Sequence, residues 1–173
     1  MRIRPALPQD ARAIAEVRVA SWRATYRGVV PDSYLDALTP EESEDRWRAV
    51  AAGEMPGAEL RVCEEGGAVA GFAAFGAARA PNFGYGGELY ATYYRPDATG
   101  KGYGSAMLRE VAVCLTALGH TDMIVWVMEA NARGRAFYER TMQLVDGSRQ
   151  SFAIDGVTIW EVAYGLRPLS TPR

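Results

Sequence analysis

The sequence predicts a single α/β (α+β) domain, and three observations carry this prediction. The chain has 173 residues, which suits one core that buries most of the apolar surface of the chain. Hydrophobic residues make up 49% and charged residues 23% of it, as in an ordinary globular protein. Short β-rich segments and segments of helical periodicity follow one another without repeats or low-complexity linkers. We therefore expect one domain over residues 1–173.

The first fifty residues predict a strand followed by two helices. Ile3 and its neighbours favour a short first strand, and apolar residues at helical spacing indicate a helix within residues 7–26. The segment TPEESEDRW predicts a second helix start. Thr39 would be its N-cap, Pro40 its first helical residue, and Glu42 would complete a capping box.

The middle of the chain predicts three strands. The segment ELRVCEEGGAVAGFAAFG is typical of a hairpin, because Gly66 and Gly67 supply the positive φ angles that a two-residue turn requires. A further strand runs through GELYATYYR and ends at Pro96. A flexible, glycine-rich stretch then separates this strand from the next helix.

The last seventy residues predict two helices and three strands. Apolar residues recur at helical spacing from Met107 to Leu118, and Gly119 offers a C-cap. The segment MIVWVM is short and apolar, so we expect a buried strand. A helix over about residues 131–142 and a hairpin around Asp155-Gly156 complete the order βααβββαβαββ.

Composition excludes several function classes. No apolar run approaches the roughly 18 residues of a membrane span, and the N-terminal segment lacks the apolar region of a secretory signal. Cys63 and Cys114 are far apart, so we expect a cytoplasmic protein without a disulfide framework. His120 is the only histidine, and a net charge of −2 gives no basic surface. We expect no metal site, no nucleic-acid partner and no membrane partner.

The stretch TGKGYGS, from Thr99 to Ser105, places glycines on alternate positions between a predicted strand and a predicted helix. Backbone amides at such a helix start bind anions, so a phosphate is the expected ligand. A P-loop does not fit, because its first glycine would fall on Arg95 and its Ser/Thr on Gly102. A Rossmann GxGxxG does not fit either, since Ser105 stands at its last glycine. A flexible turn without a ligand is the alternative.

Two segments together resemble the signatures of the GNAT N-acetyltransferase superfamily. TGKGYG is similar to its [QR]-x-x-G-x-[GA] signature, with Thr99 where Gln or Arg is usual. NARGRAFY is similar to N-x-x-[AS]-x-x-F-Y, with Gly134 at the small-residue position. The resemblance extends over about the whole chain. It implies a mixed, mainly antiparallel sheet that is flanked by helices and splays between its fourth and fifth strands.

The resemblance implies acetyl-CoA as cosubstrate and assigns residues to it. Backbone N–H groups of the glycine-rich stretch would hold the pyrophosphate, and the main chain of the fourth strand would pair with the pantetheine arm. The expected coenzyme-binding residues are Thr92, Tyr93, Tyr94, Gly100, Lys101, Gly102, Tyr103, Gly104, Ser105 and Asn131.

Proton transfer needs two further groups, and the resemblance places Glu88 and Tyr138 in these roles. An alkyl amine is free base in only about one molecule in a few thousand at pH 7, so a base is useful. Glu88 stands where a branch of the family carries a catalytic glutamate; a solvated or salt-bridged carboxylate is the alternative. Tyr138 matches the general acid of the family; a helix aromatic that only packs beside Phe137 is the alternative.

The acceptor side is less determined. Trp22, Tyr26, Tyr34 and Trp47 line an acceptor pocket or belong to the core, and both readings stay open. Met142 and Gln143 replace the usual Gly-Phe of the family. Six acids lie between Pro31 and Asp45 without a Lys or Arg, and they either favour a helix start or attract a cationic acceptor.

The sequence thus predicts an acetyl-CoA-dependent N-acetyltransferase that acts on a primary amine of a small molecule, since no long charged peptide-binding tract is evident. Acetylation of a protein N-terminus or lysine is one alternative. An acyl-CoA-binding domain without catalytic activity is another. A homodimer is compatible with the sequence.

Overall fold

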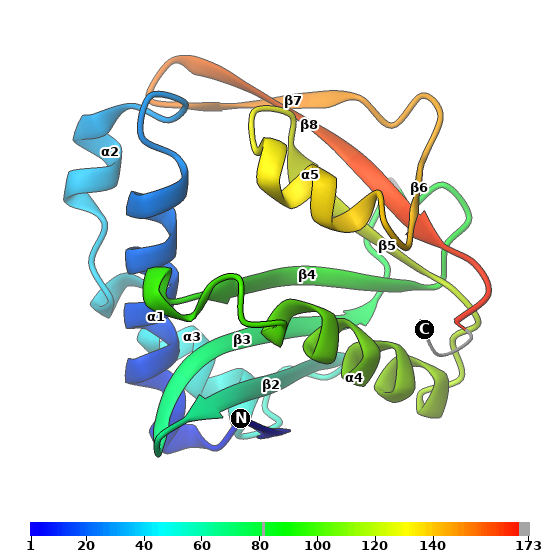
Figure 1. Cartoon of the computed structure of the whole chain (residues 1–173), viewed down its shortest axis with the longest axis horizontal. Coiled ribbons are helices and arrows are strands. Elements are labelled where there is room, and N and C mark those ends of the chain that lie inside the picture. The colour runs from blue at the N-terminus through cyan, green and yellow to red at the C-terminus, as the bar shows by residue number, and fades with distance from the viewer. Residues whose placement is uncertain (81, 170–173) are drawn as a thin grey trace.

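The computed structural model describes residues 1–80 and 82–169 (Figure 1). Thirteen helices and strands follow one another, with short 3₁₀ turns at Pro8–Asp10 and Pro96–Ala98: β1 (Arg2–Pro5), α1 (Ala11–Thr25), α2 (Asp32–Ala37), α3 (Glu41–Ala51), β2 (Ala58–Glu65), β3 (Ala68–Ala77), β4 (Gly87–Tyr94), α4 (Tyr103–Ala117), β5 (Met123–Met128), α5 (Ala132–Tyr138), β6 (Gln143–Leu144), β7 (Gln150–Ile154) and β8 (Val157–Leu166).

The strands form one mixed sheet, as the sequence predicted. Its order is β1-β2-β3-β4-β5-β8-β6, and β7 also pairs with β8. The pair β4-β5 is parallel, and the other pairs described are antiparallel. The parallel pair is possible because α4 makes the crossover between its two strands.

The sheet opens between β4 and β5. Their pairing extends only from Gly87 opposite Met123 to Leu89 opposite Val125. At this point β4 contains a bulge, because Ala91 pairs with β3 at Ala74 while Leu89 pairs at Phe75, which leaves Tyr90 as the extra residue. A bulge bends a strand and increases its twist. Beyond it, β4 and β5 diverge, which is visible in Figure 1 as the gap between β4 and the α5-β8 layer.

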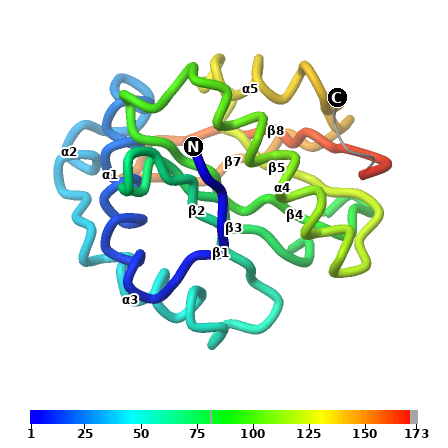
Figure 2. The backbone as a smooth tube through the Cα atoms, turned by 60° about the horizontal axis from the view of Figure 1, so that its bottom comes forward, coloured from blue at the N-terminus to red at the C-terminus, as the bar shows by residue number. Residues whose placement is uncertain are grey.

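Helices cover both faces of the sheet. In Figure 2, α1, α2 and α3 lie together on one side of the strands, and α4 and α5 lie on the other. Each side has its own buried core. Val111 and Leu115 of α4 pack with Val125 of β5, whereas Ile14 of α1 packs with Phe72 of β3.

The predicted turns are confirmed. Gly66 and Gly67 have φ angles of 60° and 83°, and Asp155 and Gly156 have φ angles of 46° and 79°. Both pairs have the left-handed conformation that a two-residue hairpin turn requires. MIVWVM is β5 with the predicted bounds.

Other boundaries differ from the prediction. The predicted capping box at Thr39 is wrong: α3 begins at Glu41, with Pro40 at the N-cap and no side-chain cap. The reason is that the cap position falls on Pro40, whose side chain has no atom that can accept a hydrogen bond. The helix expected over residues 131–142 ends at Tyr138, because a turn follows in which Met142 N–H donates to the Tyr138 carbonyl. The short elements α2 and β6 were not in the predicted order.

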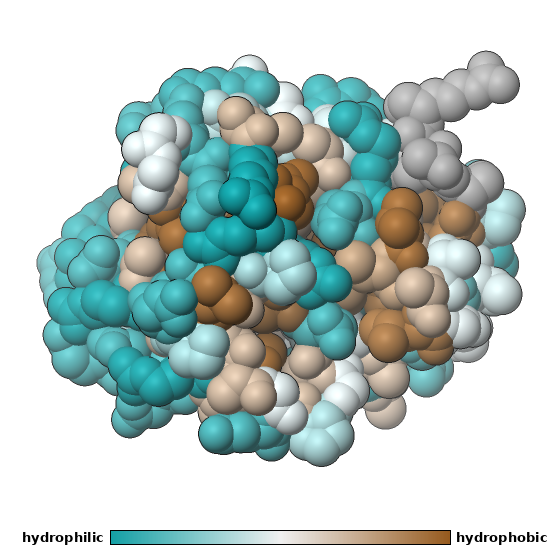
Figure 3. All heavy atoms as spheres, turned by 90° about the horizontal axis from the view of Figure 1, so that it is seen from below, coloured by the Kyte–Doolittle hydropathy of each residue, from teal (hydrophilic) through white to brown (hydrophobic). Residues whose placement is uncertain are grey.

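Figure 3 shows the face of the molecule seen from below, where hydrophobic residues occur in small groups between hydrophilic ones. Within residues 1–80 and 82–169, no helix is both long and apolar enough to cross a membrane.

Candidate active site

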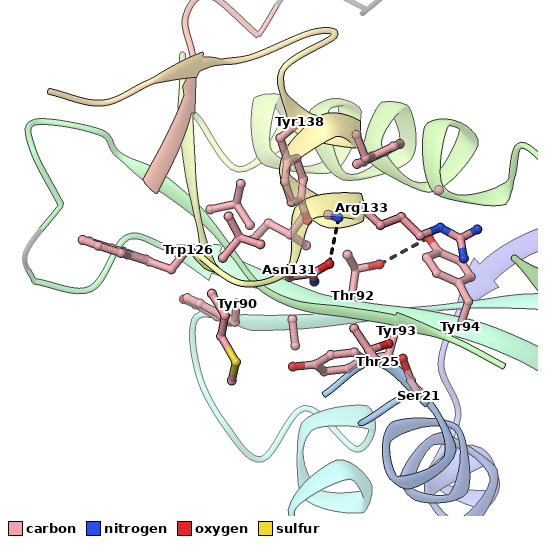
Figure 4. A pocket seen from close by; sticks show the side chains of 18 of the residues that line it. Ser21, Thr25, Tyr90, Thr92, Tyr93, Tyr94, Trp126, Asn131, Arg133 and Tyr138 are labelled. Carbon is pink, nitrogen blue, oxygen red and sulfur yellow. Dashed lines mark hydrogen bonds between the residues drawn. The ribbon is translucent and has the colours of Figure 1, made fainter. Parts of the chain in front are cut away.

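The gap between β4 and β5 leads into a cavity of about 980 Å³. This volume is within the range of ligand pockets in proteins. Residues from α1, β4, β5, α5, β7 and β8 line it, together with the loop before α4. In Figure 4, Tyr138 of α5 lies above the strands, whereas Ser21 and Thr25 of α1 lie below them. The cavity therefore connects the two faces of the sheet.

One side of the cavity, which we call the loop side, is formed by the loop 99–105 and by α5. Gly100 and Gly102 have φ angles of 79° and 82°, and Gly102 is the N-cap of α4. The first N–H of this helix with an intrahelical partner is that of Ala106, which donates to the Gly102 carbonyl (3.2 Å). The amides of residues 103–105 therefore remain free at the positive end of a 15-residue helix. This arrangement suits an anion.

Glu65 at the β2-β3 hairpin holds this loop from outside the cavity. Its carboxylate accepts hydrogen bonds from Lys101 Nζ (2.8 Å) and from the Tyr103 hydroxyl (2.6 Å). These contacts lower the pKa of Glu65, and Lys101 is the largest cause. The Lys101 side chain is thereby directed away from the cavity and does not line it. Lys101, one of the expected coenzyme-binding residues, therefore lies outside the cavity lining.

Gly104 has a different structural role from Gly100 and Gly102. Its φ angle is not positive, and a Cβ built on it would lie 3.3 Å from the Phe137 ring. The missing side chain thus allows α5 to pack against the start of α4. Small size at this position serves helix packing, whereas at Gly102 the left-handed backbone is what requires glycine.

Two arginines of the α5 region line the loop side. A Cβ built on Gly100 would lie 4.0 Å from Arg133 Nη2, and the Arg140 guanidinium lies 5.3 Å from the centre of the Phe137 ring. Figure 4 shows the Arg133 side chain extending to the same end of the cavity as Tyr94. Because no acid from the loop or α5 lines this side in the described residues, its charge is positive.

Asn131 fixes the start of α5. Its side chain accepts a hydrogen bond from the Gly134 N–H (2.8 Å), and its Nδ2 donates to the Tyr26 hydroxyl (3.4 Å). A Cβ on Gly134 would lie 2.7 Å from Asn131 Nδ2. The small residue at position 134 is therefore explained by the cap itself, which connects α5 to α1 across the cavity.

Tyr138, the last residue of α5, extends from the helix toward the gap between β4 and β5 (Figure 4). Its ring is 6% exposed and packs on Tyr164 and Phe137, with centroid distances of 6.0 Å and 5.1 Å. Burial raises the pKa of Tyr138 well above its usual range. The hydroxyl is thus protonated at neutral pH, and in the described chain it makes no hydrogen bond to another residue. It is free to donate a proton into the cavity.

Glu88 lines the cavity at the narrow end of the gap and is 2% exposed. The Arg79 N–H donates to Oε2 (2.8 Å), and the Arg79 guanidinium binds both carboxylate oxygens. The guanidinium also lies over the Tyr90 ring, 4.5 Å from its centre. Both oxygens of Glu88 are therefore occupied by one arginine.

The opposite side of the cavity, which we call the aromatic side, faces α1 and β7. Trp22 packs against Tyr26 and Tyr93, with centroid distances of 5.0 Å and 6.4 Å. The Trp22 Nε1 is buried and has no hydrogen-bond partner among the described residues. The residues that line the aromatic side are Trp22, Tyr26, Tyr90, Tyr93, Trp126, Gln150, Phe152 and Glu161, together with the Arg79–Glu88 pair.

Comparison with known proteins identifies this arrangement. The model of the acetyltransferase (GNAT) family matches residues 18–142. An uncharacterized N-acetyltransferase of Bacillus subtilis, YuaI, is 36% identical over 168 residues, which are 97% of this chain and 94% of that protein. The chain belongs to the GNAT family of acetyltransferases.

Two solved GNAT structures contain the coenzyme. PaiA N-acetyltransferase from Thermoplasma acidophilum, in complex with coenzyme A, has a TM-score of 0.74 and 17% identity, covering 96% of this chain and 98% of its own. The putative acetyltransferase YncA from Salmonella typhimurium, with its cofactor acetyl-CoA, has a TM-score of 0.72 and 22% identity, covering 96% and 93%. At these identities the likeness concerns the GNAT fold alone.

The fold brings most of the predicted GNAT site residues to this one cavity. Lys101, Tyr34 and Trp47 are exceptions. Lys101 pairs with Glu65 outside the lining, Tyr34 packs near Trp22 outside it, and Trp47 is buried against Phe72 with a centroid distance of 5.0 Å. The predicted residues that line the cavity are Trp22, Tyr26, Glu88, Thr92, Tyr93, Tyr94, Gly100, Gly102, Tyr103, Gly104, Ser105, Asn131 and Tyr138.

Sequence reasoning missed the charged residues Arg79, Arg133, Arg140 and Glu161 of this GNAT site. Three arginines within NARGRAFYER, including Arg133 and Arg140, signalled a positive α5 region next to the glycine-rich loop. A lone acid in the apolar strand VTIWEVAY was the signal for Glu161.

Proposed function

We propose that this acetyltransferase moves the acetyl group of acetyl-CoA to the primary amine of a small molecule. The observation that carries the proposal is the opening between β4 and β5, which connects an anion-binding helix start to an aromatic pocket through one cavity. The two GNAT structures that contain CoA or acetyl-CoA support the choice of cosubstrate.

The coenzyme would lie along the free edge of β4. From Tyr90 to Tyr94, this strand pairs with β3 on one side only within the described sheet. The pantetheine amides would pair with this edge as an added strand. The pyrophosphate would then meet the free amides of residues 103–105, with Arg133 and Arg140 beside it.

Tyr138 would supply the proton for the leaving thiolate. The amine nitrogen attacks the thioester carbonyl carbon, the C–N bond forms and the C–S bond breaks. A tyrosine whose pKa is raised by burial keeps its proton until the thiolate requires it. The amine must first lose the proton of its ammonium form, which requires a base.

That Glu88 is this base stays a prediction. Its position in the cavity lining supports this role, but both of its oxygens bind Arg79. For Glu88 to take a proton, Arg79 has to move or a water molecule has to mediate the transfer.

A small amine is favoured over a protein acceptor because the aromatic side is a lined cavity between α1 and β7 rather than an open groove. Acetylation of a protein N-terminus or lysine remains the second candidate. An acyl-CoA-binding domain without catalysis is the third, and it would bind coenzyme without turnover.

Free thiol release from acetyl-CoA, measured with a panel of small amines and amine-bearing peptides, tests the proposal. We expect amine-dependent thiol release and a product that is heavier than a small amine by one acetyl group. Acetylation of the peptides alone would replace the small molecule by a protein acceptor. Coenzyme binding without turnover on the whole panel would contradict the enzymatic proposal.

A further inference from the structure

We propose that Glu161 of β8 binds the ammonium group of the acceptor and takes its proton, whereas Glu88 holds Arg79. This inference rests on the proposed function and deepens it: it specifies the acceptor as a molecule that enters as a cation. The starting point is the presence of two carboxylates in the cavity lining with very different surroundings.

The position of Glu161 on its strand is unusual for a charged residue. Side chains alternate along β8, so Ile159, Glu161 and Ala163 point to the same face of the sheet. Ile159 and Ala163 are 3% and 0% exposed, and Ile159 packs in the core formed with α1. Glu161 is half-buried between these two residues and lines the cavity, so a ligand in the cavity can reach its carboxylate.

The contacts of Glu161 leave it able to bind a ligand. Its cross-strand neighbour Gln150 donates to Oε1 (2.8 Å), which fixes the orientation of the carboxylate. In residues 1–80 and 82–169, neither Glu161 oxygen forms an ion pair, and Oε2 accepts no hydrogen bond. In contrast, both oxygens of Glu88 accept hydrogen bonds from Arg79, which donates its backbone N–H and its guanidinium.

The charges that line the cavity divide between its two sides. On the loop side, Arg133 and Arg140 face no lining acid, which suits the phosphates of a coenzyme. On the aromatic side, Arg79 and Glu88 neutralise one another, so Glu161 leaves one net negative charge among aromatic rings. A cation next to a carboxylate and aromatic faces satisfies both kinds of contact.

Three titratable or charged groups face Glu161 from the elements around it: Tyr26 of α1, Tyr93 of β4 and Arg79 after β3. The negative charge of Glu161 contributes to the raised pKa of both tyrosines, for which burial is the main cause. It also raises the pKa of Arg79, after the larger effect of Glu88. Tyr26, Tyr93 and Arg79 line the same cavity as Glu161, so the carboxylate borders the space that α1 and β4 enclose.

The proton balance of the step is simple. One ammonium proton passes to the Glu161 carboxylate, and the free amine forms the C–N bond while the C–S bond breaks. The thiolate takes the Tyr138 proton, and the new amide nitrogen returns its excess proton to the tyrosinate. Glu161 then releases its proton to solvent, so each cycle yields the acetylated amine, free CoA and one proton.

A binding experiment tests the ammonium site without turnover. With the CoA complex, 2-phenylethylamine and the neutral 2-phenylethanol are titrated, and tryptophan fluorescence is read because Trp22 and Trp126 line the cavity. The wild type should prefer the ammonium compound by about tenfold or more, the size of a charge-assisted hydrogen bond. Glu161→Gln should remove this preference.

Glu129→Gln is the matched control, because Glu129 lies near the end of β5 but binds Arg149 outside the lining (2.8 Å). It should keep the preference. A wild type without ammonium preference, or a Glu161→Gln variant that keeps it, would overturn the proposal.

Thiol release with acetyl-CoA and 2-phenylethylamine separates this proposal from the proposed function. Glu161→Gln should lower kcat/KM by about 10²- to 10⁴-fold near neutral pH, and the loss should shrink as pH approaches the pKa of the amine. A loss that does not change with pH would refute the proton step. Ammonium preference in a wild type that never releases thiol would refute acetyl transfer and leave the binding site intact.

Discussion

The two sides of the cavity are built on different principles. The loop side uses main-chain groups: the free edge of β4 and the helix-start amides of residues 103–105. The aromatic side uses side chains from α1, β4, β5, β7 and β8, which are brought together by the folded sheet. In the proposed function, main-chain binding would recognise what every acetyl-CoA molecule shares, whereas side-chain binding would select the acceptor. Changes on the two sides should therefore have separable effects.

The largest effect on coenzyme affinity is expected at the loop side. Gly102→Val places a branched residue at a φ angle of 82°, so the start of α4 should shift and its free amides should lose the phosphate. We expect acetyl-CoA affinity in calorimetry to fall by roughly two orders of magnitude, the loss of one or two hydrogen bonds to a charged group.

Gly53→Val is the control for this change. Gly53 has a φ angle of 75° and open space around its Cβ position, and it follows α3 away from the cavity. It should lower the thermal stability without lowering coenzyme affinity. Equal losses of affinity in both variants would mean that backbone strain, not the phosphate site, is responsible.

Tyr138→Phe should separate chemistry from binding. Because burial raises the pKa of Tyr138, the hydroxyl donates a proton at neutral and moderately high pH alike. We expect kcat to fall by about 10²- to 10⁴-fold, with the deficit constant up to at least about pH 10. The acetyl-CoA affinity should stay within a small factor of wild type. A pH–rate profile equal to that of wild type would leave Tyr138 a packing residue.

Arg133→Ala should have a smaller effect on the loop side. Removing one exposed cation beside the phosphate loop should raise KM for acetyl-CoA by about three- to tenfold, and less at high salt. Arg109→Ala removes an exposed arginine of α4 that does not line the cavity, and it should leave KM unchanged. The same rise in both variants would indicate a general charge effect.

The smallest effect concerns the acids of residues 32–45. Arg12, Arg27 and Arg48 pair with Asp32, Asp36, Glu41, Glu44 and Asp45. These three arginines offset part of the charge of the six acids, and one exposed charge contributes little, so Glu42→Gln should change kcat/KM for a cationic acceptor by less than about twofold. A larger decrease in kcat/KM that disappears with added salt would indicate that these acids attract a cationic acceptor.

The sequence predicted the loop side better than the aromatic side for a physical reason. A site made of main-chain groups requires particular residue types at adjacent positions, and these can be read from the local sequence. Gly100 and Gly102 have the positive φ angles that favour glycine, and Gly134 is small because the Asn131 cap lies against it. The bulge at Tyr90 and the Arg79–Glu88 pair depend on strand pairing between distant segments, which no local pattern states.

The cross-strand pairing of Glu161 could be predicted from the sequence, but its position in the cavity could not. The two-residue turn at Asp155-Gly156 fixes the hairpin register, and this register places Gln150 opposite Glu161. The sequence did not show that the face of β8 carrying Glu161 is directed toward the cavity, because this depends on the packing of α1 against β8. The pair could be predicted, but its place in the cavity could not.

Backbone amide NMR during titration with CoA tests the central claim, that main-chain groups of β4 and of the α4 start hold the coenzyme. The account predicts that the largest shifts and the strongest protection from hydrogen exchange fall on the amides of residues 90–94 and 102–105. Amides of the β7-β8 hairpin should change little. Binding with the largest changes on α1 and the β7-β8 hairpin, and none at residues 102–105, would contradict it.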